Sequence, residues 1–509
     1  MALHAFLDRV ARLDRRPALV PVWRDCLLDT VTPVAAFARL REGPFAFLLE
    51  SAPAGGETWA RYTYLGTAPR AAWRLRDGAV DRWSADEGWT AMPRPADPLA
   101  AFEREVTAYP PTDEPSLGPF WSGAVGFFTY DAVRYIERLP HAPPRVIDAP
   151  DALFVFTDAL VIIDNLRGQA RVVCGVPIDA DDDAETLRDK YEAAEATLER
   201  TVERLHAPDA LAPLEIDQTV PPAEGTSSMS RDAFEDAVRR IKEYILAGDC
   251  FQALLARRIA VPHDFDGHTL YRVLRALNPS PYMYHLAFDG IELVGSSPEL
   301  LVRLDRGRVT VRPIAGTRPR GSDAAMDAAL GDELLADEKE RAEHIMLVDL
   351  GRNDVGRIAR IGSVQVTDLM TIERYSHVMH IVSQVEGDLG EGASGIDVFR
   401  ATFPAGTMTG APKVRAMEII DELEPVRRGP YAGAVGFIAA GARRMDLAIT
   451  IRTCVIADGV ANVQAGGGIV ADSDPAMEWA ESENKARAML TAIARARSAR
   501  QVRAAAYTS

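Results

Sequence analysis

Residues 446–493 read DLAITIRTCVIADGVANVQAGGGIVADSDPAMEWAESENKARAMLTAI and combine two strand-like runs with one long helical pattern. The runs DLAITIRTCVI and GVANVQA are rich in β-branched and aliphatic residues, which favour strands. Asp474 and Pro475 then form a typical helix start, because aspartate caps a first turn and proline is tolerated there. This stretch predicts sheets with helices packed on their outer faces.

The same mixture of strands and helices continues through residues 230–509. Ser230 is a helix cap, Phe234 and Val238 begin an apolar face, and Gly248 ends the pattern. Further strand candidates are FQALLARRIAV, IELVGSS and RVTVRPI, with apolar-faced helices between them. We therefore predict a sheet-rich mixture of α and β structure in this C-terminal region.

An N-terminal region, residues 1–204, contains the short β-type runs FAFLLES, WARYTYLG and ALFVFTDALVII, and ends in a charged helix. Residues 205–229, LHAPDALAPLEIDQTVPPAEGTSSM, are rich in proline, serine and alanine and have no sustained period. We predict that they form a linker between the two regions.

The composition excludes several classes of protein. A net charge of −17 over 509 residues opposes binding of phosphate backbones, so no nucleic acid partner is expected. No run of about 18 apolar residues suggests a membrane span, and the N-terminus lacks a signal-peptide core, so a cytoplasmic location is expected. The four cysteines are far apart and form no CxxC, which disfavours disulfides or zinc.

Two helical segments each carry glutamates three residues apart. Glu340 and Glu343 lie in DELLADEKERAEHIMLVDL, and Glu478 and Glu481 follow Asp474. Residues at this spacing share a helix face, so four carboxylates would converge if the faces met. Such a cluster needs a cation, and Mg²⁺ suits oxygen ligands. Solvated surface glutamates are the commoner outcome.

Three segments of small residues are predicted as loops: PIAGTRPRG (313–321), FPAGTMTGAPK (403–413) and VQAGGGIV (463–470). Such loops either bring backbone N–H groups close to a ligand or form ordinary tight turns. Arg452 lies within the apolar run ITIRTCVI, which we interpret as a strand. Its guanidinium requires a carboxylate partner, from the protein or from a substrate.

These segments together resemble the chorismate-utilising enzymes over roughly residues 230–493. The matching blocks, in order, are GDCFQ, NPSPYMYHL, GSSPE, PIAGTRPRG, AEHIMLVDLGRND, YSHVMHIVS, FPAGTMTGAPKVRAMEII, RGPYAGAVG, IRT, QAGGGIVADSDP and ESENKA. The N-terminal region resembles that family's amino-terminal domain through LLESA, RYTYLG and GAVGFFTYDAVRYIE. The resemblance implies an α+β fold, with large, mostly antiparallel sheets packed as a β-sandwich and helices outside.

Two positions indicate the subgroup. Gln252 occupies the place of a lysine that activates water in isochorismate and salicylate synthases, and Ala315 that of a nucleophilic lysine in aminodeoxychorismate synthases. The resemblance therefore points to anthranilate synthase component I. It implies Mg²⁺-dependent amination of chorismate by ammonia at C2, then pyruvate elimination to anthranilate in tryptophan biosynthesis.

The resemblance also implies roles for individual residues. The metal ligands would be Glu343 and Glu481, with Glu340 and Glu478 beside them. Four residues would be catalytic. Glu299 would protonate the departing C4 hydroxyl and His380 would assist pyruvate loss, and the other two are Thr409 and Lys413. The substrate-binding group would be Gly316, Thr317, Tyr431, Arg452, Gly466, Gly468 and Gln252. Two departures, Gly467 where the family commonly has alanine and Thr409 where it often has serine, affect only local loop shape.

Regulation and partners follow from the same resemblance. A tryptophan feedback pocket would comprise Glu50, Ser51, Asn278, Pro279, Tyr282 and Met283. The alternative is that LLES is simply a core strand and NPSPYM a turn. None of the cysteines sits in a glycine-rich elbow, so ammonia is expected from a separate glutamine amidotransferase subunit in a hetero-oligomer. The alternatives are aminodeoxychorismate synthase component I, 2-amino-2-deoxyisochorismate synthase, and an inactive regulatory subunit that binds chorismate or tryptophan.

Overall fold

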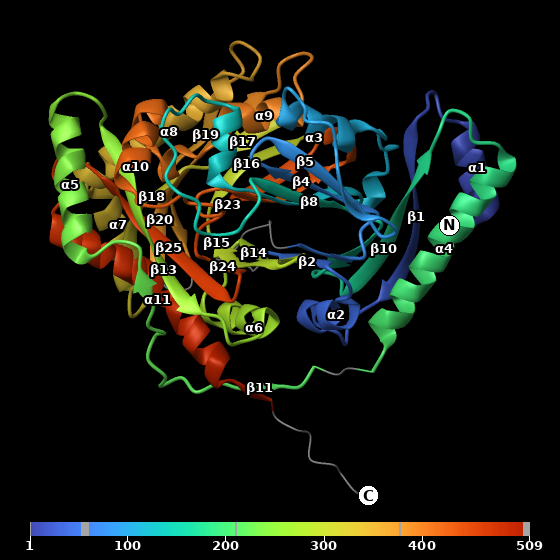
Figure 1. Cartoon of the computed structure of the whole chain (residues 1–509), viewed down its shortest axis with the longest axis horizontal. Helices are drawn as coiled ribbons and strands as arrows, with labels where there is room; N and C mark the ends of the chain where they lie inside the picture. Colours follow the sequence, from blue (N-terminus) through green and yellow to red (C-terminus); the bar gives the residue numbers. More distant parts are fainter. Residues whose placement is uncertain (1, 52–60, 209–210, 376–377, 502–509) are drawn as a thin grey trace, which may run out of the picture.

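Two large antiparallel sheets, here called sheet A and sheet B, face each other in the computed structural model (Figure 1), which describes residues 2–51, 61–208, 211–375 and 378–501. Sheet A runs in the order β1 (Ala18–Leu27), β10 (Gln169–Ile178), β9 (Ala159–Asp164), β3 (Tyr62–Thr67), β2 (Phe45–Glu50), β14 (Tyr282–Phe288), β15 (Ile291–Ser297), β24 (Thr453–Ala457), β25 (Val460–Ile469), β13 (Gln252–Pro262) and β12 (Thr226–Ser227), and β21 (Gly410–Ala411) also pairs with β13. Sheet B runs β18 (Ile314–Pro319), β20 (Val378–Asp388), β17 (Arg308–Val311), β16 (Leu300–Asp305), β23 (Met445–Ile449), β22 (Ala434–Ala439), β7 (Gly123–Phe128), β8 (Ala152–Phe156), β4 (Ala71–Arg76), β5 (Ala79–Ser84) and β6 (Gly88–Ala91), and β19 (Gln365–Arg374) pairs with β20.

Both sheets are continuous across the N-terminal and C-terminal regions. In sheet A, β2 pairs with β14 so that Glu50 lies opposite Met283. In sheet B, β7 pairs with β22 along its whole length. The layer between the sheets is apolar, and the stacked rings of Phe120 and Phe437, whose centroids are 4.3 Å apart, are part of it. The domain boundaries expected from the sequence remain a proposal.

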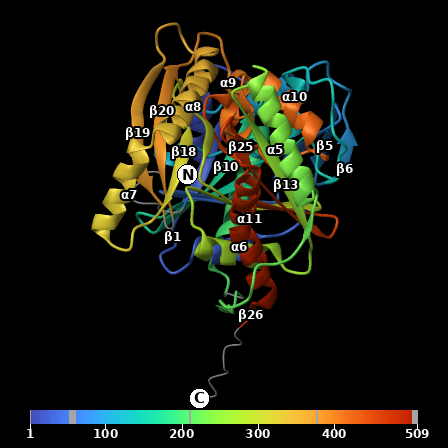
Figure 2. The ribbon, with the colours of Figure 1, turned by 90° about the vertical axis from the view of Figure 1, so that its left-hand side faces the viewer.

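Helices cover the outer faces, as the sequence predicts. On sheet A, α1 (Leu3–Ala11), α2 (Pro33–Leu40) and α4 (Ala184–His206) pack at one end, and α5 (Arg231–Leu246), α6 (Gly267–Leu277) and α11 (Pro475–Ser498) at the other (Figure 2). On sheet B lie α7 (Ala324–Ala336), α8 (Glu338–Gly356) and α9 (Gly395–Thr402), with α3 (Pro98–Thr107) beside α9, and α10 (Lys413–Leu423) packs on β13. A short ribbon pairs β11 (Leu214–Glu215) with β26 (Arg500–Gln501). None of the helices described could cross a membrane.

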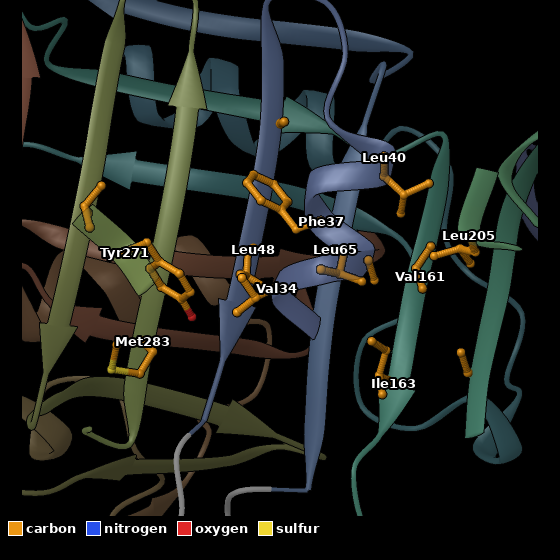
Figure 3. Close-up of a cluster of buried hydrophobic side chains, with 14 of the residues drawn as sticks. Val34, Phe37, Leu40, Leu48, Leu65, Val161, Ile163, Leu205, Tyr271 and Met283 are labelled. Carbon is orange, nitrogen blue, oxygen red and sulfur yellow. The ribbon is translucent and has the colours of Figure 1, made fainter. Parts of the chain in front are cut away.

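Figure 3 shows why α2 docks on sheet A. Val34 of the helix lies beside Leu48 and Leu65 of the strands below it, and Leu40 lies on the side of Val161 and Leu205. The Phe37 ring packs against His285 of β14. All of these side chains are buried, and removing an aliphatic or aromatic side chain of this size from water contributes about 1.5–3 kcal/mol. The α+β sandwich implied by the resemblance is therefore confirmed.

Local sequence signals predicted several boundaries correctly. Ser230 caps α5 by accepting from the Ala233 N–H, and Asp474 caps α11 by accepting from the N–H groups of Ala476 and Met477. The segment DELLADEKERAEHIMLVDL is not one helix, however. Asp337 ends α7 and caps α8, so Glu340 and Glu343 both lie in α8.

Some interpretations of apolar and small-residue segments were wrong. VQAGGGIV and PIAGTRPRG lie largely in strands β25 and β18 rather than in loops. DLAITIRTCVI is two strands in different sheets, β23 in sheet B and β24 in sheet A, and ALFVFTDALVII divides in the same way into β8 and β9. Arg452 therefore lies not within a strand but where the chain crosses between the sheets, with φ at +50°.

Candidate active site

The candidate residues gather where β13 and β25 of sheet A approach β18 and β20 of sheet B. Gln252 begins β13, and its side-chain Nε2 lies 3.5 Å from Glu343 Oε1 on α8. Gly316 of β18 lies between α8 and β20, because a Cβ there would be 3.2 Å from Glu340 Oε2 and 3.3 Å from the Ile381 side chain. The sheets thus bring together residues that lie more than 200 positions apart in the sequence.

His380 is buried on β20 and is held in one tautomer. Its Nδ1 lies 2.8 Å from the Gly316 carbonyl oxygen and 3.1 Å from Thr317 Oγ1. A carbonyl oxygen only accepts, so Nδ1 carries the hydrogen and Nε2 keeps its lone pair. Burial lowers the pKa of His380 to about 4, and Arg452 and Lys485 also act to lower it. At neutral pH the residue is an uncharged base.

Glu299 has the opposite protonation state. It lies between β15 and β16 and is only 7% exposed. Burial raises the pKa of Glu299 to about 8, although Thr407, Lys485 and Arg452 act in the other direction. The carboxyl therefore keeps its proton at neutral pH and can serve as an acid.

Four glutamates, here called the glutamate cluster, face one another from two helices: Glu340 and Glu343 of α8, and Glu478 and Glu481 of α11. Gly467 of β25 has no side chain where the α11 pair approaches, since a Cβ there would lie 3.0 Å from Glu478 Oε2 and 3.3 Å from Glu481 Oε1. Burial, and then the Glu340 carboxylate, raise the pKa of Glu343. Burial also raises the pKa of Glu478. The carboxylates of the cluster therefore repel one another.

The glutamate cluster suits a cation. Within the described residues no three metal-ligating side chains are close enough to form a ready-made site. Mg²⁺ does not need one, because it keeps several waters and binds through one or two carboxylates. Glu478 Oε2 is buried without a hydrogen-bond partner among the described residues, a state that a cation would relieve.

Lys485 is a member of the site that the sequence analysis missed. Its Nζ lies 2.6 Å from Glu481 Oε1 and donates to the Gly466 carbonyl oxygen at 3.0 Å. It also influences the pKa of Glu299, Glu343 and His380. Its place in the block ESENKA was a signal, but a Glu–Lys pair four residues apart is typical of a solvated helix face.

Arg452 presents a guanidinium that has no carboxylate partner among the residues described. Burial lowers the pKa of Arg452, while Tyr431 and Glu299 act to raise it, which places both residues near it. The sequence left open whether its partner is a protein or a substrate carboxylate. Among the described residues no carboxylate is bound to it, so a ligand's carboxylate fits.

Gln252 and the glycines of β25 form one wall. A Cβ on Gly468 would lie 1.9 Å from Gln252 Nε2, so only glycine allows the amide to cross this strand. Gly466 offers its carbonyl oxygen to Lys485. Gln252 Oε1 is buried and accepts no hydrogen bond from the described residues.

Thr409 and Lys413 have other partners. The Thr409 hydroxyl is fully buried and donates to the Ala405 carbonyl oxygen at 3.0 Å. The threonine that lowers the pKa of Glu299 is Thr407 instead. Lys413 Nζ lies 2.9 Å from both carboxylate oxygens of Asp354. Their proposed catalytic roles have no direct support from these contacts.

Four of the six expected feedback residues border a cavity of about 470 Å³ between the sheets, here called the inter-sheet cavity. Glu50, Ser51, Tyr282 and Met283 line it, whereas Asn278 and Pro279 do not. The Glu50 carboxylate already accepts hydrogen bonds from the Tyr271 hydroxyl and the Arg275 guanidinium.

Comparisons with known proteins agree with this geometry. Residues 47–491 match the model of the chorismate binding enzyme family. Anthranilate synthase component 1 of Pseudomonas aeruginosa is 50% identical over 482 residues, covering 93% of this chain and 95% of the relative. The Aquifex aeolicus protein of the same name is 46% identical and covers 97% and 98%.

Solved structures show the same fold. Anthranilate synthase component I from Streptococcus pneumoniae superposes with a TM-score of 0.74 at 35% identity, covering 91% of this chain and 99% of that one. The menaquinone-specific isochorismate synthase of Escherichia coli, at 18% identity and a TM-score of 0.67 over 96% and 99%, shares the fold. The family predicted from the sequence is confirmed: this chain belongs to the chorismate binding enzymes.

Proposed function

We propose that this chain is the synthase subunit of anthranilate synthase, which aminates chorismate at C2 with ammonia and then eliminates pyruvate to give anthranilate, the first step of tryptophan biosynthesis. The observation that carries this proposal is the reversed protonation of Glu299 and His380. A buried acid whose pKa is about 8 and a buried base whose pKa is about 4 share one site. Groups whose pKa values are moved apart in this way mark acid and base roles.

The proton transfers follow from these states. Ammonia attacks C2 while Glu299 gives its proton to the departing C4 hydroxyl, which leaves as water. The neutral Nε2 of His380 then takes the C2 proton as the C3–O bond breaks, so that the enolpyruvyl group leaves as the enolate of pyruvate. Protonation of the methylene carbon of that enolate gives pyruvate and balances the proton taken from C2. The buried, unpartnered Gln252 Oε1 is an acceptor for an N–H of the incoming ammonia.

Substrate binding uses the remaining groups. The Arg452 guanidinium binds one chorismate carboxylate beside Tyr431. Gly316, Thr317 and the β25 glycines bind other parts of the substrate. Glu343 and Glu481 would hold Mg²⁺, with Glu340 and Glu478 beside them. When bound, the metal neutralises a substrate carboxylate.

Ammonia comes from a separate glutamine amidotransferase subunit. Burial raises the pKa of all four thiols, those of Cys26, Cys174, Cys250 and Cys454. A glutaminase nucleophile requires a lowered thiol pKa or an adjacent base.

The inter-sheet cavity is the proposed site for tryptophan as a feedback inhibitor, a role supported by its size and by the four expected residues that line it.

Product analysis tests the reaction. Purified chain is incubated with chorismate, Mg²⁺ and an ammonium salt at alkaline pH, and the products are separated by chromatography. Anthranilate is expected, and Glu299→Gln is the matched inactive control. Only 4-amino-4-deoxychorismate or isochorismate would overturn the proposal in favour of another synthase, and binding without turnover would indicate a regulatory subunit.

A further inference from the structure

The turn that carries Arg452 is held by one side-chain and one backbone hydrogen bond. Thr453 Oγ1 donates to the Ile451 carbonyl oxygen at 2.8 Å, a bond that spans Arg452. The Arg452 carbonyl oxygen accepts from the Ser296 N–H at 3.1 Å. With φ at +50°, Arg452 adopts a backbone conformation that a non-glycine residue keeps only when its surroundings impose it.

Tyr284 contacts this turn from two strands away. Because the single hydrogen of the Thr453 hydroxyl is used on Ile451, Tyr284 must donate the hydrogen bond that joins Tyr284 Oη to Thr453 Oγ1. Tyr284 lies opposite Gly295, and Gly295 lies opposite Thr453, across β14, β15 and β24. A Cβ on Gly295 would lie 2.2 Å from Tyr284 Cζ, so the glycine is what lets the ring reach Thr453.

We propose that Tyr284 is a positioning residue for substrate binding: its hydroxyl, through Thr453, fixes the left-handed turn that directs the Arg452 guanidinium into the active site. This inference rests on the proposed role of Arg452 as a carboxylate binder. The Tyr284 ring also lines the inter-sheet cavity, so the same contact joins the wall of that cavity to the substrate site.

Tyr284→Phe and Thr453→Val test the proposal with little change in volume. Tyr284→Phe removes only the bond to Thr453, whereas Thr453→Val removes that bond and the one to the Ile451 carbonyl oxygen. Chorismate affinity is measured without ammonia, by equilibrium dialysis with Mg²⁺ present, together with KM and kcat. In Tyr284→Phe we expect the dissociation constant and KM to rise about threefold to tenfold, the loss of one buried hydrogen bond, while kcat changes little. In Thr453→Val, which loses two hydrogen bonds, the rise should be at least as large. Thr453→Ser should restore wild-type affinity.

The control is Tyr130→Phe, which removes a buried hydroxyl that has no hydrogen-bond partner among the described residues. It should leave affinity unchanged, and matching melting curves establish that all variants fold. If Tyr284 acts through Arg452, adding Tyr284→Phe to Arg452→Gln should weaken binding no further. Normal affinity in Tyr284→Phe, or an additive effect in the double variant, overturns the inference. Normal affinity in Arg452→Gln alone instead overturns the proposed role of Arg452.

Discussion

The Nδ1 atom of His380 donates to the carbonyl oxygen of Gly316 across the β20–β18 edge of sheet B, at 2.8 Å. This bond fixes the ring orientation and leaves Nε2 as the only basic atom of the residue. Since the pKa of His380 is about 4, the base is available throughout the neutral range.

Replacing His380 should separate the two half-reactions. In His380→Ala, we expect elimination of pyruvate to slow by about a hundredfold or more, the usual contribution of a general base, while amination continues. Chromatography of quenched reactions should then show the aminated intermediate that still carries its enolpyruvyl group. Anthranilate formation at the normal rate would exclude a catalytic role for His380.

The pH dependence of amination should follow Glu299. Its acid form is lost as the pH rises through about 8, so the rate divided by the free ammonia concentration should fall above that pH. Division by free ammonia is necessary because ammonia itself becomes more abundant as the pH rises. A normalised rate that stays constant to pH 9.5 (about one and a half units above the expected pKa) would show that another group supplies the proton.

The same residue should lower stability at alkaline pH. The folded-state pKa of about 8 lies above the ordinary value of 4.5, so the folded protein holds this proton more tightly than the unfolded chain. Stability is therefore lost as the pH rises between these values. Glu299→Gln should raise the melting temperature by several degrees at pH 8.5 and leave it unchanged near pH 4. Equal melting temperatures at pH 8.5 would contradict the buried, protonated state.

The glutamate cluster predicts how activity depends on metal. Glu343→Gln and Glu481→Gln should each lower turnover by about a hundredfold or more, since a misplaced substrate is enough for a loss of that size. Both should fold normally, because each substitution removes one negative charge from a cluster of carboxylates whose mutual repulsion raises the pKa of Glu343. Circular dichroism and assays across a Mg²⁺ titration check this. Near-normal turnover of both variants at saturating Mg²⁺ would remove these residues from the site.

The sequence predicted most elements because their signals are local. Caps such as Ser230 and Asp474 and the apolar faces behind them need only a few neighbouring residues. The crossing at Arg452 left no such signal, because the apolar run continues while the chain changes sheets. The segment's strand propensity was correct, and its division between two sheets is set by tertiary packing.

The glycines and Lys485 show a second limit. Gly467 and Gly468 were interpreted as loop residues, yet they lie in a strand and are required by side chains that approach from α11 and β13. That requirement comes from distant residues and is invisible in a local pattern. Lys485 was missed for the same reason, because only the fold shows that the Glu481 face is turned toward the active site.

Tryptophan binding tests the inter-sheet cavity. Its volume of about 470 Å³ and the lining residues Glu50 and Tyr282 suit an aromatic amino acid. Calorimetry should detect tryptophan, with phenylalanine binding more weakly because its ring buries less apolar surface. Inhibition further requires that tryptophan prefer one conformation of the protein. No detectable binding at millimolar tryptophan would refute the assignment.

The chain's use of ammonia depends on how much of it is unprotonated. At neutral pH most ammonia is protonated and has no lone pair with which to attack carbon. None of the four thiols is activated, since burial raises the pKa of each. The chain alone should therefore need high ammonium and alkaline pH. Mixed with a glutamine amidotransferase subunit, it should use glutamine at neutral pH, because ammonia released beside the site is shielded from protonation. The measurement is anthranilate fluorescence with glutamine or ammonium, with and without the partner. Glutamine-dependent product from the highly purified single chain would show that this protein activates glutamine itself.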